Sequence, residues 1–207
     1  MKLERLTLKL LAENCYIYHN EENCIVFDPG SDFEHIKEFI LSKNLKISYI
    51  LLTHCHFDHV GAASDLKDFF NTKILCHKDD LTTLKVANKS ATYYGLEPVK
   101  VPEIDGFVND NDIIDFCDIS IKVIHTPGHS TGSVCYYIEQ DNILISGDTL
   151  FLESIGRTDF PTGSYDDIIN SIENKLYTLP DNTVVYPGHG FHSTIEHEKK
   201  FNPFIQG

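Results

Sequence analysis

The chain has 207 residues and a mass of 23.5 kDa, a length typical of one domain or at most two small ones. Hydrophobic residues make up 42% and charged residues 23% of the chain, which is the composition of a folded globular protein and excludes disorder as the main state. The 17 Lys and Arg against 31 Asp and Glu give a formal net charge of -14, opposite in sign to a nucleic-acid-binding surface. We therefore expect no nucleic-acid partner.

The sequence carries no sign of membrane insertion or secretion. No apolar run reaches the roughly 18 to 20 residues of a membrane span, and residues 1–11 alternate apolar and polar side chains, unlike a signal peptide. The six cysteines show no CxxC spacing and lie in apolar or strand-like segments, so we expect them to be reduced and mostly buried. We expect a cytoplasmic protein without membrane contact, and, because no linker interrupts the chain, a single domain over residues 1–207.

Hydrophobic periodicity predicts alternating strands and helices. The N-terminal part predicts an alternating strand at 6–10 and a hairpin at 15–28. A helix that begins at Phe33 and stops at Asn44 follows, with Ser31 and Asp32 as candidate caps. The later elements are a strand at 47–52, a helix at 60–70, a strand at 73–76, a helix at 79–86, mostly strand over 107–145, a helix at 166–179, a strand at 183–186 and a helix at 194–201. This order predicts an α/β protein.

Four candidate metal ligands follow the predicted strand at 47–52: His54, His56, Asp58 and His59. In an extended segment alternate side chains face the same way, so His54 and His56 can bind one ion. Asp58 and His59 fall on the turn into the next helix and can reach a second ion. A polar surface loop is the alternative, but it does not account for three imidazoles and a carboxylate packed together at one strand end.

Three neighbours of these ligands are expected to support the site without binding metal. Cys55 lies between two ligands and should point away from both, so we assign it to packing. Asp28 and Thr53 are candidates to anchor the ligand loop through hydrogen bonds.

Further candidate ligands lie later in the chain. His129, Asp148 and His189 each follow a strand-like run and come directly after a glycine. Ligands at the ends of several strands gather at one edge of a sheet, where sites commonly form. Five histidines and two aspartates make seven ligands, more than one tetrahedral ion uses, and a carboxylate can bridge two ions. The sequence therefore predicts a dinuclear metal centre, whose paired ions suit the hydrolysis of an acyl bond.

The chain resembles the metallo-β-lactamase superfamily, whose signature is a His-x-His-x-Asp-His segment followed by a distant His, an Asp and a last His; all these positions are filled here. Within it, the segments 147–151, 154–161 and 202–204 are similar to the compact glyoxalase II-like hydrolases. The resemblance implies a four-layer αβ/βα sandwich with the metal site along the shared edge of two mixed sheets.

The resemblance also implies roles for the ligands. The first metal would be held by His54, His56 and His129, the second by Asp58, His59 and His189, with Asp148 bridging the two. We expect two divalent ions, with zinc preferred and iron or manganese as alternatives, because imidazole and carboxylate ligands without thiolate suit all three. The implied reaction is attack of a metal-bridging hydroxide on a small anionic acyl-thiol such as S-lactoylglutathione, with Asp58 and Asp148 as catalytic carboxylates. The expected assembly is a monomer or a small homo-oligomer.

Two residues are candidates for substrate binding. Arg157 matches the position of a basic residue that binds a glutathione carboxylate in glyoxalase II enzymes, and the alternative is a structural ion pair with Asp159. His192 lies three residues after His189, so it can line the mouth of the pocket or lie on a loop surface. Thr158 and Asp159 stand where an aromatic residue is expected, so the resemblance does not fix glutathione as the thiol carrier.

Two other functions stay open. A persulfide dioxygenase shares the stretch at 156–160 and uses a single iron held by two His and an Asp; the segment 202–204 favours the hydrolase instead. The other alternative is a non-catalytic metal-binding or regulatory protein that retained the fold. The intact set of ligands argues against it.

Overall fold

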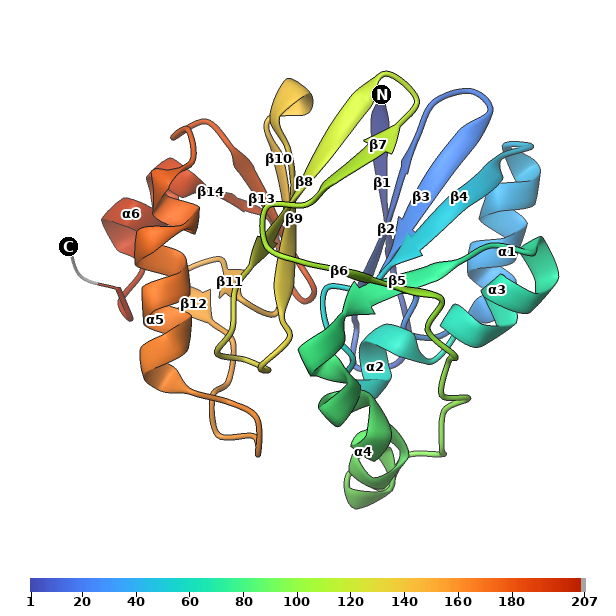
Figure 1. Cartoon of the computed structure of the whole chain (residues 1–207), viewed down its shortest axis with the longest axis horizontal. Coiled ribbons are helices and arrows are strands. Elements are labelled where there is room, and N and C mark those ends of the chain that lie inside the picture. The colour runs from blue at the N-terminus through green and yellow to red at the C-terminus, as the bar shows by residue number, and fades with distance from the viewer. Residues whose placement is uncertain (206–207) are drawn as a thin grey trace. The chain divides into compact units, whose positions relative to one another are not determined.

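The computed structural model describes residues 1–205 and divides the chain into two compact units. Unit 1 comprises Met1–Cys76 and Leu81–Phe107, and unit 2 comprises His77–Asp80 and the residues from Val108 onward. Each unit contains a mixed six-stranded sheet with helices beside it (Figure 1). This arrangement confirms the predicted α/β class with mixed sheets.

The sheet of unit 1 has the strand order β1-β2-β3-β4-β5-β6. Its strands are β1 (Lys2–Thr7), β2 (Asn14–His19), β3 (Asn23–Phe27), β4 (Lys46–Leu51), β5 (Ile74–His77) and β6 (Gly106–Val108). The helices are α1 (Phe33–Ser42), α2 (Phe57–Val60), α3 (Ala63–Phe70) and α4 (Leu81–Tyr93). The pairs β1-β2 and β2-β3 are antiparallel, whereas β3, β4 and β5 run parallel because helices return the chain between them.

One apolar core holds the helices of unit 1 to its sheet. Ile36 and Ile40 of α1 are four residues apart and share one face of the helix. Together with Leu66 of α3 they are fully buried in one cluster with Val26 and Ile50 of the sheet. Figure 1 shows α1 and α3 along the same side of this sheet. Burial of each such side chain contributes about 1.5 to 3 kcal/mol, so this core fixes the strand ends from which the ligand loop departs.

The structure corrects three details of the helix predictions. Asp32 occupies the N-cap of α1 but makes no side-chain cap, because its carboxylate accepts a hydrogen bond from the backbone N–H of Lys9 at 2.7 Å. The helix predicted at 60–70 is divided into α2 and α3. The helix predicted to end at Val86 continues to Tyr93, since Ala87 and Ala91 bury a narrow face that hydrophobic periodicity alone does not reveal.

The sheet of unit 2 has the strand order β14-β13-β10-β9-β8-β7. Its strands are β7 (Ile113–Phe116), β8 (Ile119–His125), β9 (Val134–Ile138), β10 (Ile143–Gly147), β13 (Val184–Pro187) and β14 (Ser193–Thr194); a separate hairpin consists of β11 (Leu150–Phe151) and β12 (Ser154–Ile155). The helices are α5 (Tyr165–Asn174) and α6 (Ile195–Phe201). Ile168 and Ile172 of α5 are fully buried in one cluster with Leu144 and Val185 of the sheet.

A buried carboxylate joins the C-terminal segments of unit 2. Glu198 in α6 is fully buried, and its two oxygens accept hydrogen bonds from the Ser193 hydroxyl, from the backbone N–H of Glu153 at 2.9 Å and from the Asn202 side-chain amide at 2.9 Å. A buried charge is tolerated when several donors satisfy it. Glu198 therefore ties α6 to the β11–β12 hairpin and to β14, and gives Asn202 a structural role.

The short segment His77–Asp80 follows β5 along the chain but packs within unit 2. The ring of His77 stacks on the ring of His125, with 4.2 Å between centroids and an angle of 11°. Asp80 is fully buried, and its carboxylate accepts a hydrogen bond from the backbone N–H of Gly132 at 3.3 Å, while Thr131 donates to the Asp79 carbonyl at 3.3 Å. The segment thereby braces the loop between β8 and β9.

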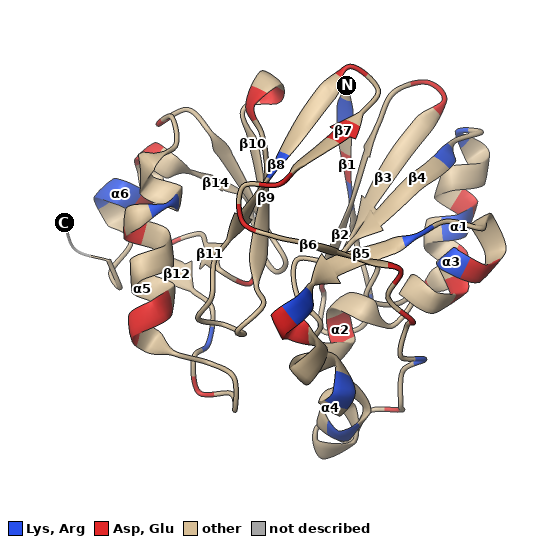
Figure 2. Cartoon of the chain, viewed as in Figure 1, with Lys and Arg blue, Asp and Glu red and all other residues tan. Residues whose placement is uncertain are grey.

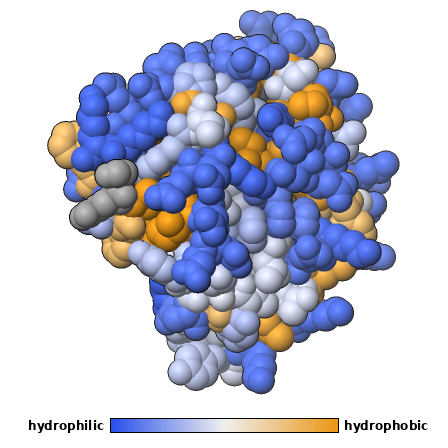
Figure 3. Space-filling model, turned by 60° about the vertical axis from the view of Figure 1, so that its left-hand side comes forward, coloured by the Kyte–Doolittle hydropathy of each residue, from blue (hydrophilic) through white to orange (hydrophobic). Residues whose placement is uncertain are grey.

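Charges on the surface are mixed in sign. Lysines of α3 and α6 lie close to Asp and Glu (Figure 2), as in the ion pairs of Lys67 with Asp105 and of Lys200 with Glu196. On the face drawn in Figure 3, apolar residues form separate small patches on a mostly hydrophilic surface. Among residues 1–205 there is no helix with the length and apolar character needed to cross a membrane.

The stacked pair of histidines makes stability depend on pH. Burial and the neighbouring His125 lower the pKa of His77 below its ordinary value, although three nearby carboxylates act in the opposite direction: Asp79, Asp80 and Asp110. The unfolded chain then binds a proton at His77 more readily than the folded chain does. The contribution of His77 to the free energy of unfolding is therefore fully present above the unfolded pKa of about 6.5 and is lost as the pH falls below it.

We predict that His77→Gln flattens the pH dependence of unfolding. The free energy of urea unfolding, measured with a chelator present, should fall less between pH 7.5 and pH 5.5 in this variant than in the wild type. The control is His35→Gln, because His35 is an exposed residue of α1. An equal fall in wild type and His77→Gln would contradict the role assigned to the stacked ring.

Candidate metal centre

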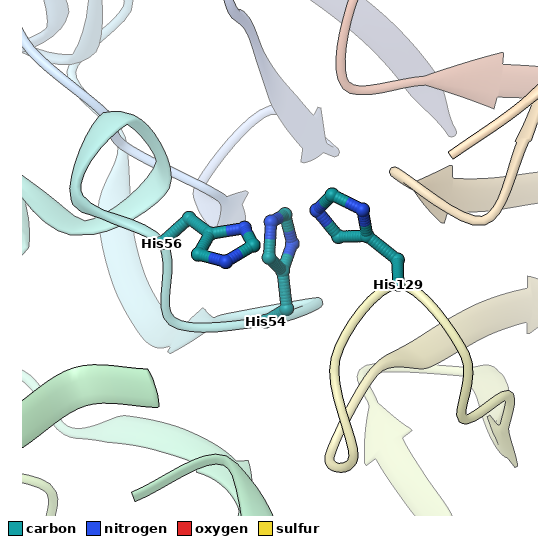
Figure 4. Close-up of side chains that lie close together, drawn as sticks. All are labelled: His54, His56 and His129. Atoms are coloured by element: carbon teal, nitrogen blue, oxygen red, sulfur yellow. The ribbon is translucent and has the colours of Figure 1, made fainter. Parts of the chain in front are cut away.

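The loop after β4 gathers the predicted ligands of unit 1. His54 and His56 lie on this loop (Figure 4), and Asp58 and His59 lie in α2. The ring centroid of His54 is 4.8 Å from that of His56 and 4.1 Å from that of His59. His59 Nε2 is 3.9 Å from Asp58 Oδ2. The sequence spacing therefore produces a compact cluster of three imidazoles and one carboxylate.

Apolar packing holds this loop in place. Phe57, between two predicted ligands, is 4% exposed and packs in a cluster with Ala87 and Ala91 of α4. Cys55 is fully buried in the main apolar core of unit 1, as predicted. A Cβ on Gly30 would lie 1.5 Å from the backbone oxygen of Asp58, so only glycine lets the two backbone segments approach this closely.

Asp28 fixes the orientation of two histidines. Its Oδ1 accepts a hydrogen bond from Thr53 N–H at 2.7 Å, and its Oδ2 accepts from the Thr53 hydroxyl at 2.5 Å and from His59 Nδ1 at 3.1 Å. Because the Thr53 hydroxyl gives its only proton to Asp28, its oxygen must accept from His54 Nδ1, which is 3.1 Å away. The predicted anchoring by Asp28 and Thr53 is thus confirmed.

These bonds determine which nitrogen of each ring can bind metal. A proton on Nδ1 leaves the lone pair on Nε2, and the Nε2 atoms of His54 and His59 are both buried. Asp28 itself lies close to both rings. Its oxygens accept hydrogen bonds from Thr53 and from His59 Nδ1, so Asp28 anchors the loop and orients the His59 ring.

Unit 2 brings together the remaining three predicted ligands. His129 lies on the loop after β8 (Figure 4), Asp148 follows β10 and His189 follows β13. His129 Nε2 and His189 Nε2 lie 3.6 and 3.7 Å from the same atom, Asp148 Oδ2. These distances are too long for hydrogen bonds, but two ligands with bonds of about 2.0 to 2.2 Å to one ion have a similar separation. The donor set of unit 2 therefore fits metal binding.

The stretch Gly156–Phe160 encloses His129. The backbone oxygen of Arg157 accepts a hydrogen bond from His129 Nδ1 at 2.9 Å, which again directs Nε2 to Asp148. A Cβ on Gly156 would lie 1.8 Å from the backbone oxygen of Asp148. Phe160 meets His129 edge-on, with 5.5 Å between ring centroids. The sequence motif thus has a structural reason, and Phe160 is a contact that sequence analysis did not identify.

The two candidate substrate residues have different surroundings. The Arg157 side chain pairs with Asp159 through two hydrogen bonds, from Nε at 2.9 Å and from Nη2 at 2.8 Å, which is the structural alternative considered above. His192 is exposed, and its ring lies 5.9 Å from that of Tyr186. Its role in substrate binding stays a prediction.

We predict that Asp28→Asn weakens metal binding by about 10- to 100-fold, because an amide cannot accept all three hydrogen bonds and no longer fixes the ring protons. Competition with a chromogenic chelator measures this affinity. Asp32→Asn is the matched control, since Asp32 is also an aspartate with positive φ and its substitution removes the same charge. An affinity of Asp28→Asn equal to that of the control would contradict the orienting role.

Comparisons with known proteins extend over almost the whole chain. The family profile of the Metallo-beta-lactamase superfamily matches residues 8–189. The probable metallo-hydrolase YqgX of Bacillus subtilis is 35% identical, and the match covers 100% of this chain and 99% of the relative. The hydroxyacylglutathione hydrolase GloC of Haemophilus influenzae is 34% identical over 99% of this chain and 98% of its own length.

Solved structures show the same fold. The structure of BLEG-1, described as a B3 metallo-β-lactamase, has a TM-score of 0.93 and 35% identity, with full coverage of both chains. TTHA1623 in a di-iron-bound form has a TM-score of 0.90 and 33% identity, covering 98% of this chain and 100% of its own. The sequence resemblance and the fold expected from it are therefore confirmed: the chain belongs to the metallo-β-lactamase superfamily of metallo-hydrolases.

Proposed function

We propose that the chain is a metal-dependent thioester hydrolase with a dinuclear centre. His54, His56 and His129 would hold the first ion, Asp58, His59 and His189 the second, and Asp148 would bridge them. The observation that carries the proposal is the common protonation pattern of His54, His59 and His129. Each has an acceptor at Nδ1, so each offers Nε2 as a metal ligand. The kinship with the hydroxyacylglutathione hydrolase GloC supports the choice of thioester.

The residues themselves account for most of what the site must do. Bound divalent ions would supply a hydroxide at neutral pH and polarise the carbonyl of the substrate. Asp28, through Thr53, and the Arg157 carbonyl hold the imidazole protons away from the ligand nitrogens. Asp58 and Asp148 add two negative charges that partly balance the cations. A thiolate leaving group has a pKa of about 8.5 and needs no general acid. This suits a site whose histidines and aspartates are all assigned to metal binding.

The donor set restricts the metal without fixing it. Imidazole and carboxylate ligands suit zinc, iron and manganese, and Cys55 lies in the apolar core, so it offers no thiolate. Zinc remains our first choice, and the di-iron-bound relative supports iron as the alternative. The proposed substrate is a small anionic acyl-thiol.

Hydrolysis of β-lactams is the second candidate function, because BLEG-1 is described as a B3 metallo-β-lactamase and is 35% identical to this chain. Both reactions involve attack of hydroxide on a carbonyl. They differ in the leaving group, since an amine leaves less readily than a thiolate and benefits from protonation. Comparing kcat/KM for S-lactoylglutathione and for a cephalosporin on one metal-loaded sample separates the two candidates.

We predict that His56→Ala and Asp148→Asn each reduce thioester turnover by about 100-fold or more, because each removes a metal ligand, and that both lower the metal content found by elemental analysis. His35→Ala is the control, as His35 lies exposed on α1. Full activity in either ligand variant would refute the site. One iron per chain, no hydrolysis and oxygen uptake with glutathione persulfide would instead favour a persulfide dioxygenase, and bound metal without any turnover would favour a non-catalytic role.

A further inference from the structure

The side chain of Arg157 is already occupied by a carboxylate of its own chain. Asp159 accepts hydrogen bonds from Nε and Nη2, so it binds one edge of the guanidinium in the two-pronged manner that a substrate carboxylate would use. The guanidinium carbon also lies over the ring of Phe160, at 4.6 Å from its centroid. The cation is therefore held at its edge by Asp159 and at its face by Phe160.

This pair stands next to the proposed metal centre. Phe160 touches His129 edge-on, and the backbone oxygen of Arg157 accepts the Nδ1 hydrogen bond of His129. The side chains of Arg157 and Asp159 are 59% and 68% exposed, so an incoming substrate can reach both. The backbone contact to His129 does not depend on either side chain, which lets the two functions be tested separately.

Together these contacts point to a role in choosing the substrate. We propose that Asp159 acts as an internal carboxylate that blocks Arg157, and that the enzyme therefore favours acyl-thiols whose carrier has no carboxylate at this position. The inference rests on the proposed thioesterase function and narrows its substrate class. The Arg157–Asp159 ion pair presents no net charge to a carboxylate that arrives at this position.

Competition explains why an exposed pair can have this effect. An exposed ion pair is weak, so a substrate carboxylate at high concentration would displace Asp159. However, Asp159 is two residues from Arg157, and a partner tethered this closely has an effective concentration of about millimolar or higher. The pKa of Asp159 is lowered by its hydrogen bond from Arg157, so the blocking carboxylate stays charged at neutral pH. A dilute substrate carboxylate is therefore outcompeted.

The experiment compares two esters with the same acyl group. S-lactoylglutathione has carboxylates on its thiol carrier, and S-lactoyl-N-acetylcysteamine has none. We predict that Asp159→Asn raises the ratio of kcat/KM for the glutathione ester to that for the cysteamine ester by about fivefold. Asp181→Asn, which removes an exposed aspartate paired with Lys199, controls for the change in net charge and should leave the ratio at its wild-type value.

A double-mutant cycle tests whether Arg157 transmits the effect. In the Arg157→Gln background, Asp159→Asn should no longer change the ratio, since no guanidinium is left to release. A ratio that rises equally in both backgrounds would show general repulsion by Asp159 and overturn the proposal. A ratio within twofold of the wild type in Asp159→Asn would also overturn it.

Failure of the thioesterase function would be visible as the absence of hydrolysis of both esters by the wild type. The blocking role would then be measured by calorimetry with S-methylglutathione, which retains the carboxylates and cannot be hydrolysed as a thioester. Binding that is about fivefold tighter in Asp159→Asn than in the wild type would support the proposal. Equal binding, or none to either protein, would reject it.

Discussion

The carboxylate of Asp28 is the interaction on which the candidate site depends most. It reaches the ligand loop from the end of β3 and accepts three hydrogen bonds, two from Thr53 and one from His59. Through the Thr53 hydroxyl it also determines the proton position on His54. One buried negative charge thereby orients two imidazoles, and a carboxylate partner makes an imidazole a stronger ligand. Asp28 has a φ of 47°, an uncommon conformation for a residue other than glycine, and its hydrogen bonds hold it there.

In unit 2, a backbone carbonyl orients the imidazole of His129. The backbone oxygen of Arg157 is this acceptor for His129. Gly156 lets the neighbouring backbone approach Asp148 closely, and Phe160 contacts the ring of His129. The segment His77–Asp80 braces the loop between β8 and β9, which carries His129, through contacts with His125 and Gly132. A neutral acceptor raises the basicity of an imidazole less than a carboxylate does. Among the predicted ligands, His59 is therefore oriented directly by the Asp28 carboxylate, His54 through the Thr53 hydroxyl, and His129 by a neutral carbonyl.

Much of the candidate site could be predicted because its ligands are close in sequence or follow strand ends. The spacing of His54, His56 and His59 is local, and the buried strand before them is a clear apolar run. The stacking of His77 on His125 could not be predicted, because the two residues are 48 positions apart and no periodic pattern links them. The extension of α4 was missed because Ala87 and Ala91 give a weak apolar signal. For Arg157 the sequence offered two partners, a substrate carboxylate or Asp159, and only the side-chain geometry shows that Asp159 is engaged.

We propose above that two metal ions are held through Nε2 of the predicted histidine ligands. A crystal structure of the metal-loaded protein, with anomalous diffraction recorded at the absorption edge of the bound metal, tests it most directly. We predict two peaks about 3.5 to 4 Å apart, one beside His54, His56 and His129, the other beside Asp58, His59 and His189, with Asp148 between them. A single peak, or coordination through Nδ1 with Asp28 as a ligand, would contradict it.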